Sequence, residues 1–139
     1  MYNKEYLRWC EAVGEEYLQA ELKEIGGNDE AIKERFLLNL EFGTAGLRGV
    51  IGAGTNRMNI YTVGQASQGL AAYVNSVTPN GKIAIAYDSR IKSEVFARVA
   101  AAIFAANGIK VYIYCHSRKY STPCLCTDAD RVNRLSASR

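Results

Sequence analysis

The chain has 139 residues, a length that corresponds to one ordinary domain and is small for a multidomain enzyme. Apolar residues make up 48% and charged residues 22% of it, a composition that argues against disorder or a fibrous repeat. The net charge of +3 is mild, and no basic block or basic stripe with interleaved aromatic residues occurs, so a nucleic-acid partner is not expected.

The N-terminus and the cysteines indicate a cytoplasmic protein without a membrane partner. Lys4, Glu5 and Arg8 interrupt the apolar core that a signal peptide would need. No segment is long and apolar enough to span a bilayer. The four cysteines lack C-x-x-C spacing, which fits reduced thiols better than a disulfide framework.

The first 41 residues have the pattern of two amphipathic helices. Apolar residues recur at helical spacing between residues 3 and 25 and predict one helix that ends at Gly26-Gly27. Asn28 or Asp29 can cap a second helix, which leads into a glycine-rich segment. The two apolar stripes consist of Tyr6, Trp9, Cys10, Val13 and Tyr17, and of Ile32, Phe36 and Leu40.

The glycine-rich segment, residues 42–57, contains five glycines and two arginines. Glycine allows backbone N–H groups to approach an anion closely, and arginine offers a planar pair of donors for phosphate oxygens. The same composition also describes a glycine-rich hairpin with two surface arginines. Composition alone leaves both interpretations open.

An α/β pattern follows the glycine-rich segment. Helical periodicity predicts a helix over residues 60–77, and Thr78-Pro-Asn-Gly81 predicts a loop. The apolar run Lys82–Tyr87 predicts a strand covered on both faces. A helix that ends at Asn107-Gly108 and a strand over residues 109–114 complete a βαβ unit, which should have parallel strands and a right-handed crossover.

Asp88-Ser-Arg90 lies at the carboxyl end of the first of these strands, where ligands bind in open α/β sheets. A helix N-cap with a surface ion pair explains the same residues without a ligand, and we favour that interpretation.

Apolar periodicity stops after Tyr114, and the small, polar and basic residues that follow predict a poorly ordered tail. His116 lies in this tail near Cys115, Cys124 and Cys126, but their spacing matches no common zinc site. Nothing around His116 suggests the fixed element that a catalytic triad needs. We therefore expect neither a metal site nor a triad there.

Two motifs of the glycine-rich region resemble the opening of an α-D-phosphohexomutase. They are Phe42-Gly-Thr-Ala-Gly-Leu-Arg-Gly49 and Gly52-Ala-Gly-Thr-Asn-Arg-Met-Asn59, and Ala84-Ile-Ala-Tyr-Asp-Ser-Arg90 is similar to the family's next strand and turn. The chain most resembles the phosphoglucomutase/phosphopentomutase branch, which has two helices before the first motif. The resemblance extends from residue 1 to Tyr114.

This resemblance implies a fold and an activity. The implied fold is α/β: an incomplete α/β/α sandwich with a mixed sheet over residues 42–115, preceded by a helical extension over 1–41 and followed by a non-matching tail over 116–139. The implied enzyme interconverts sugar 1-phosphates and 6-phosphates, or pentose 1- and 5-phosphates, through a phosphoserine and a bisphosphate intermediate. Mg²⁺ and a sugar bisphosphate primer would assist it.

The same resemblance implies roles for individual residues. Arg48 is implied to contact the phosphoserine or the transferred phosphate, and Thr44 to line the same cleft. Arg57 and Arg90 are further candidate phosphate ligands. No residue of the chain is expected to bind the metal.

The chain departs from the family pattern after Tyr114. Ser121-Thr-Pro123 is similar to a turn of the family, but the Thr-Ala-Ser-His-Asn-Pro loop that bears the phosphoserine does not occur, and neither Ser136 nor Ser138 precedes His-Asn-Pro. We therefore expect a truncated or frame-shifted product of a mutase gene that is inactive alone. The alternatives are a non-catalytic sugar-phosphate-binding or regulatory module and a purely structural fragment.

Overall fold

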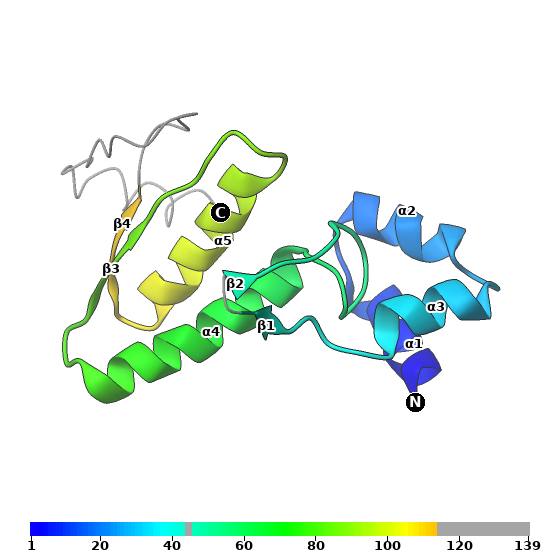
Figure 1. Cartoon of the computed structure of the whole chain (residues 1–139), viewed down its shortest axis with the longest axis horizontal. Helices are drawn as coiled ribbons and strands as arrows, with labels where there is room; N and C mark the ends of the chain where they lie inside the picture. Colours follow the sequence, from blue (N-terminus) through cyan, green and yellow to red (C-terminus); the bar gives the residue numbers. More distant parts are fainter. Residues whose placement is uncertain (44–45, 114–139) are drawn as a thin grey trace. The chain divides into compact units, whose positions relative to one another are not determined.

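The computed structural model describes residues 1–43 and 46–113, which form two compact units (Figure 1). The first unit, Met1–Thr62, contains three helices, a short hairpin and the start of α4; the second begins at Val63. The elements are α1 (Tyr2–Ala12), α2 (Glu16–Glu24), α3 (Asp29–Phe36), β1 (Phe42–Gly43), β2 (Gly46–Leu47), α4 (Ile60–Val77), β3 (Lys82–Ile85), α5 (Ser93–Ala106) and β4 (Lys110–Ile113). The predicted α/β class is confirmed.

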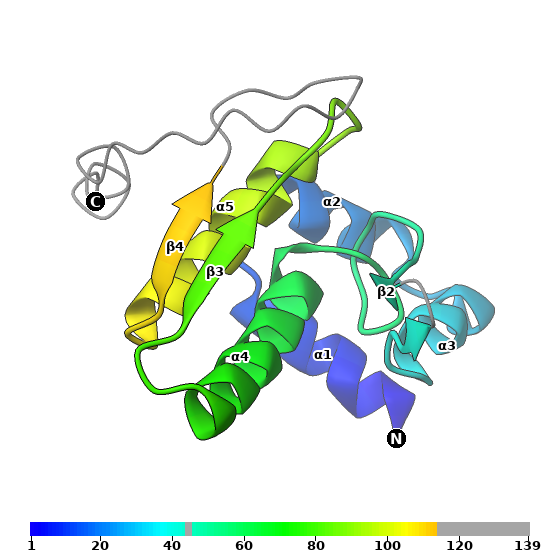
Figure 2. The same cartoon turned by 60° about the vertical axis from the view of Figure 1, so that its left-hand side comes forward.

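The second unit is built around β3 and β4, which lie side by side and parallel (Figure 2). Ile83 is opposite Val111, and Ile85 is opposite Ile113. Helices α4 and α5 pack on this apolar face, and α5 ends at Ala106 with Asn107 as its C-cap, before Gly108 with φ +76°. The predicted helices and the parallel pairing are therefore confirmed. The buried cluster consists of Ala71, Ala101, Phe104, Ile109 and Val111.

The prediction of a strand covered on both faces is wrong for the described residues. The strand ends at Ile85, and its side chains alternate, with Lys82 and Ala84 exposed and Ile83 and Ile85 partly buried. The reason is that α4 and α5 both contribute to the cluster on the isoleucine face. The described strands form one antiparallel and one parallel pair, so the sandwich and its mixed sheet stay predictions.

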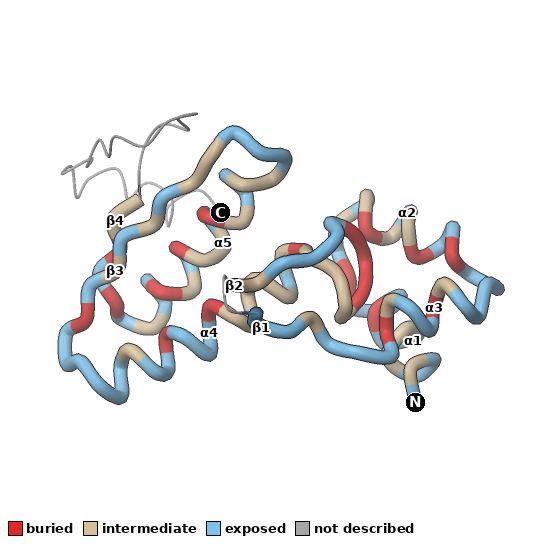
Figure 3. The backbone as a smooth tube through the Cα atoms, in the orientation of Figure 1, coloured by how far each residue is buried: buried red, intermediate tan, exposed pale blue. Residues whose placement is uncertain are grey.

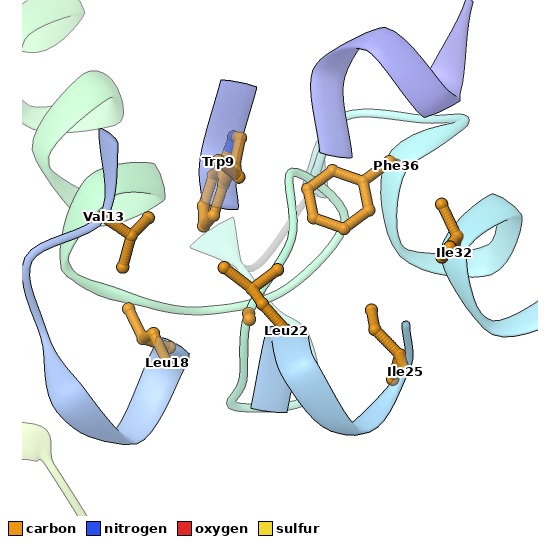
Figure 4. Packing of buried hydrophobic residues seen from close by; sticks show 8 residues of the cluster. Trp9, Val13, Leu18, Leu22, Ile25, Ile32 and Phe36 are labelled. Carbon is orange, nitrogen blue, oxygen red and sulfur yellow. The ribbon is translucent and has the colours of Figure 1, made fainter. Parts of the chain in front are cut away.

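The first unit has its own hydrophobic core between the three helices (Figure 3). Leu18 and Leu22 of α2 are fully buried, and the rings of Trp9 and Phe36 meet edge to face with centroids 5.6 Å apart (Figure 4). Ala53, from the glycine-rich segment, belongs to the same core. The core consists of Trp9, Val13, Leu18, Leu22, Ile25, Ile32, Phe36 and Ala53.

The prediction of one helix over residues 3–25 is wrong, because the chain breaks between α1 and α2. Val13 and Glu15 are extended, with φ/ψ of −75°/125° and −76°/121°. Gly14 lies between them, and glycine is a poor helix former. The break allows α2 to fold back, so that Trp9 and Leu22 enter one core; a straight helix would separate its ends.

The predicted second helix is confirmed as α3, with Asn28 as its N-cap. The Asn28 side-chain oxygen accepts a hydrogen bond from the Ala31 N–H at 3.2 Å. Leu40, predicted to extend the helix stripe, lies beyond its end at Phe36. Among the described helices, none has the length and apolar character needed to cross a membrane.

Candidate functional site

The glycine-rich segment begins as a hairpin. Phe42 pairs with Leu47 and Gly43 with Gly46 in an antiparallel arrangement, and Gly46 has φ +96°. The hairpin interpretation is therefore confirmed for this first part of the segment. Thr44 lies outside the described residues.

Arg48 follows the hairpin directly. Its side chain is exposed, and its guanidinium forms no hydrogen bond or ion pair within the described part of the chain. The next residue, Gly49, lies against Leu40 so closely that an added Cβ would be 2.7 Å from the leucine Cδ1. Leu40 thus touches the backbone on one side of Arg48, while the planar set of N–H donors of Arg48 stays available.

The second part of the segment, residues 50–58, folds back on itself. Ile51 and Met58 form an isolated bridge, in which the Gly52 N–H donates to the Met58 carbonyl at 3.1 Å. The Met58 N–H donates to the Val50 carbonyl at 2.8 Å. These bonds close a compact loop between residues 50 and 58.

Asn59 holds this loop from inside and is fully buried. Its Nδ2 donates to the carbonyl oxygens of Gly52 at 2.9 Å, Gly54 at 3.0 Å and Arg57 at 3.3 Å. The Gly52 carbonyl has no other donor among the described residues, whereas the Gly54 carbonyl also accepts from the Arg57 N–H and the Arg57 carbonyl from the Thr62 hydroxyl.

The oxygen of the same amide caps α4. Asn59 Oδ1 accepts from the N–H groups of Tyr61 at 3.1 Å and Thr62 at 3.0 Å. In return, the Thr62 hydroxyl accepts from the Asn59 N–H at 3.0 Å, an arrangement like a capping box. Asn59 thus fixes the loop and the start of the helix together.

Two charged side chains of the helices reach the loop. Glu21 Oε2 accepts from the Ala53 N–H at 2.9 Å and from Arg35 Nη1 at 2.8 Å. Arg35 Nη1 also donates to the Ala53 carbonyl at 3.3 Å, and the Arg35 carbonyl accepts from the Asn56 N–H at 3.0 Å. Nothing in the local sequence signals this contact, because Glu21 and Ala53 are 32 positions apart.

Arg57 differs from Arg48 in its surroundings. Its side chain is only 15% exposed, and Nη2 is 2.5 Å from Glu34 Oε2. Asn56 adds a hydrogen bond from Nδ2 to the Glu34 carbonyl at 3.2 Å. The structure therefore places Arg57 in the contact between loop and α3, whereas Arg48 has no carboxylate partner among the described residues.

Arg90 belongs to the second unit and forms a turn with Asp88. The Asp88 carboxylate accepts from the Arg90 N–H at 3.1 Å and from Arg90 Nε at 2.7 Å. The expected ion pair is confirmed. The expected N-cap is wrong, because α5 begins at Ser93 after Lys92; the Asp88 N–H instead donates to the Ser93 hydroxyl at 3.3 Å.

The backbone N–H of Arg90 lowers the pKa of Asp88 below its ordinary value, with smaller contributions from the Arg90 and Ser93 side chains. Because the pKa of Asp88 is lower in the folded state, its carboxylate stabilises the turn at pH values above the pKa of the unfolded chain. This contribution disappears as the pH falls through the pKa of the folded state. In an NMR titration of the Asp88 carboxyl, Arg90→Ala should raise the midpoint only partly, because the N–H remains. Full return to the free-aspartate midpoint would show instead that the side chain dominates.

In proteins Mg²⁺ is usually held by one or two carboxylates together with water molecules and substrate phosphates. Across residues 1–43 and 46–113, no three His, Cys, Asp or Glu side chains gather in a way that could hold a metal ion. Cys115, His116, Ser121, Pro123, Cys124, Cys126, Ser136 and Ser138 lie outside the described residues.

Comparison with known proteins gives relatives that are all named as sugar-phosphate mutases. The chain is 49% identical over 78 residues to a probable phosphoribomutase of Schizosaccharomyces pombe, which covers 54% of this chain and 13% of the relative. It is 39% identical over 97 residues to a phosphopentomutase of Homo sapiens, covering 63% and 16%. It is 35% identical over 105 residues to a phosphoglucomutase of Staphylococcus aureus, covering 76% and 19%.

The chain thus spans less than a fifth of the length of these relatives. No solved structure matches it significantly. Residues 39–134, more than half of the chain and including the whole glycine-rich segment, match the family described as phosphoglucomutase/phosphomannomutase, alpha/beta/alpha domain I. The chain belongs to this phosphoglucomutase/phosphomannomutase domain I family.

Proposed function

We propose that the chain is the N-terminal part of a phosphosugar mutase and supplies one side of its phosphate site. The complete enzyme would interconvert a sugar 1-phosphate and a 6-phosphate, or a pentose 1- and 5-phosphate, through a phosphoserine and a bisphosphate intermediate. Its first domain would be an α/β/α sandwich with a mixed sheet. The enzyme would work in the cytoplasm. Mg²⁺ would assist the complete enzyme, but no described residue is proposed as its ligand.

The observation that carries this proposal is the state of Arg48. An exposed guanidinium with no ion pair among the described residues follows a glycine-rich hairpin, and Leu40 lies against the next residue, Gly49. A planar guanidinium binds two phosphate oxygens at once and stabilises charge as a phosphoryl group is transferred. Thr44 and Arg90 remain proposed phosphate contacts; Arg90 pairs with Asp88 but is 87% exposed, whereas we assign Arg57 a weaker contribution because its side chain pairs with Glu34 and is only 15% exposed.

Arg48→Ala should abolish the binding of sugar phosphate to the chain, because it removes the donors that grip the phosphate. Isothermal calorimetry with glucose 1-phosphate and with ribose 5-phosphate measures this. Arg8→Ala is the matched control, since Arg8 is an exposed arginine paired with Glu5 at 3.0 Å on α1. Equal loss in both variants would indicate only a general charge effect.

A mutase assay with glucose 1-phosphate and a bisphosphate primer tests the proposed inactivity of the isolated chain. We expect no turnover, because the sequence contains no Thr-Ala-Ser-His-Asn-Pro loop to carry the phosphoryl group. Turnover by the purified chain would contradict the proposed division of the site.

A further inference from the structure

The helices before the glycine-rich segment contribute more than apolar packing to it. We infer that Glu21 and Arg35 are positioning residues for Arg48: they fix the loop from which the phosphate-binding guanidinium projects. This inference rests on the proposed function of Arg48. It concerns two side chains that lie outside both glycine-rich motifs.

The first step is the contact of the ion pair with backbone. Glu21 Oε2 accepts from Ala53 N–H and from Arg35 Nη1, and Arg35 Nη1 also reaches the Ala53 carbonyl. The pair therefore binds both backbone groups of one residue. Ala53 itself is fully buried in the first core, so its position leaves little freedom.

The fit around this contact is close. A Cβ at Gly52 would be 2.7 Å from Glu21 Oε2. A Cβ at Gly54 would be 2.7 Å from the Arg35 carbonyl oxygen. The glycines on either side of Ala53 thus allow the two helices to approach the loop backbone directly.

The second step leads from Ala53 to Arg48 along the backbone. Gly52 donates to the Met58 carbonyl, and Met58 donates to the Val50 carbonyl, which is two residues from Arg48. On the other side, Leu40 packs on Gly49, and its N–H donates to the Thr55 carbonyl at 2.8 Å. The position of the Arg48 backbone therefore depends on the loop that the ion pair holds.

An ordinary surface ion pair lacks these features. Arg98 and Glu94 pair at 2.7 Å within α5, with side chains 50% and 52% exposed. Arg35 and Glu21 are 21% and 32% exposed, come from different helices and also bond to the loop. Charged groups that bond partly buried backbone contribute more than exposed pairs.

The experiment compares Glu21→Gln with Glu24→Gln in the full chain. Both changes neutralise one carboxylate of α2, but Glu24 is exposed and has no partner among the described residues. Arg35→Lys is a second variant, which keeps the charge and loses the planar fork. The readouts are amide hydrogen exchange at Gly52, Ala53 and Met58, the affinity for inorganic phosphate well below the melting temperature, and the melting temperature itself.

We expect Glu21→Gln to accelerate exchange at these three amides more than in the helices, and to raise the Kd for phosphate about tenfold. Glu24→Gln should change neither, and Arg35→Lys should give an intermediate effect. A lower melting temperature with unchanged local exchange and unchanged Kd would indicate a merely structural pair and overturn the inference.

The two proposals can fail separately. If the unmodified chain does not bind phosphate, the proposed function of Arg48 fails, and selective exchange at the three amides decides whether the pair holds the loop. If the chain binds phosphate and Glu21→Gln binds it equally, the proposed function stands and the positioning role of Glu21 is overturned.

Discussion

Asn59→Ala is expected to destabilise the first unit by about 3 kcal/mol. The substitution removes the cap of α4, leaves the buried Gly52 carbonyl without a donor and leaves the Gly54 carbonyl with only the Arg57 N–H at 3.3 Å. An exposed cap alone contributes about 1 kcal/mol, and each buried group left unsatisfied adds about 1 kcal/mol or more. Urea unfolding followed by tryptophan fluorescence measures this, because Trp9 lies in the core of the same unit.

Asn56→Ala is the matched control for this change. Asn56 lies in the same loop but donates a single side-chain hydrogen bond, to the Glu34 carbonyl, in an exposed contact. We expect a loss of about 0.5–1 kcal/mol. Equal losses in the two variants would show that the buried network of Asn59 does not stabilise the loop.

Gly54→Ala should destabilise the same unit by a similar amount, about 3 kcal/mol, for a different reason. Gly54 has φ +131°, and an added Cβ would lie 2.7 Å from the Arg35 carbonyl oxygen and 2.9 Å from the Arg35 Cβ. The obstacle is backbone, so it cannot rotate away. Any shift would also disturb the hydrogen bond from Asn56 N–H to the Arg35 carbonyl.

Gly14→Ala provides the comparison, since an added Cβ there meets nothing within 4 Å and its φ lies outside the left-handed region. This change should leave the stability within about 0.5 kcal/mol or raise it slightly, because alanine restricts the unfolded chain. Thermal unfolding of both variants measures the difference. A Gly54→Ala variant as stable as the Gly14→Ala variant would show that the loop can move away from α3.

Periodicity in the sequence was sufficient for the elements of the second unit. The helix predicted over residues 60–77 coincides with α4. The predicted ends of the two strands lie within two residues of the ends of β3 and β4. Both helices have long apolar stripes, and glycine or a turn marks their ends, so local signals agree with the packed structure. Whether helices cover one face or both faces of a strand could not be predicted, because this depends on how distant helices pack on the sheet.

The first unit was harder to predict, because its decisive contacts are distant in sequence. Gly14 lies within a continuous helical stripe, so periodicity did not reveal the break. The bonds of Glu21 and Arg35 to Ala53 leave no mark in local sequence. Asn59 had a usable signal, because asparagine directly before an apolar helix is a preferred N-cap residue.

The presence of Ala53 in the core of the helices has a consequence for how the glycine-rich segment opens. The Ala53 side chain packs in the core formed by α1, α2 and α3, and the Ala53 backbone forms hydrogen bonds to Glu21 of α2 and Arg35 of α3. Local unfolding proceeds in cooperative units whose members share buried contacts. In the unmodified chain we therefore expect residues 51–59 to open together with the three helices, as long as the Glu21–Arg35 contact couples them.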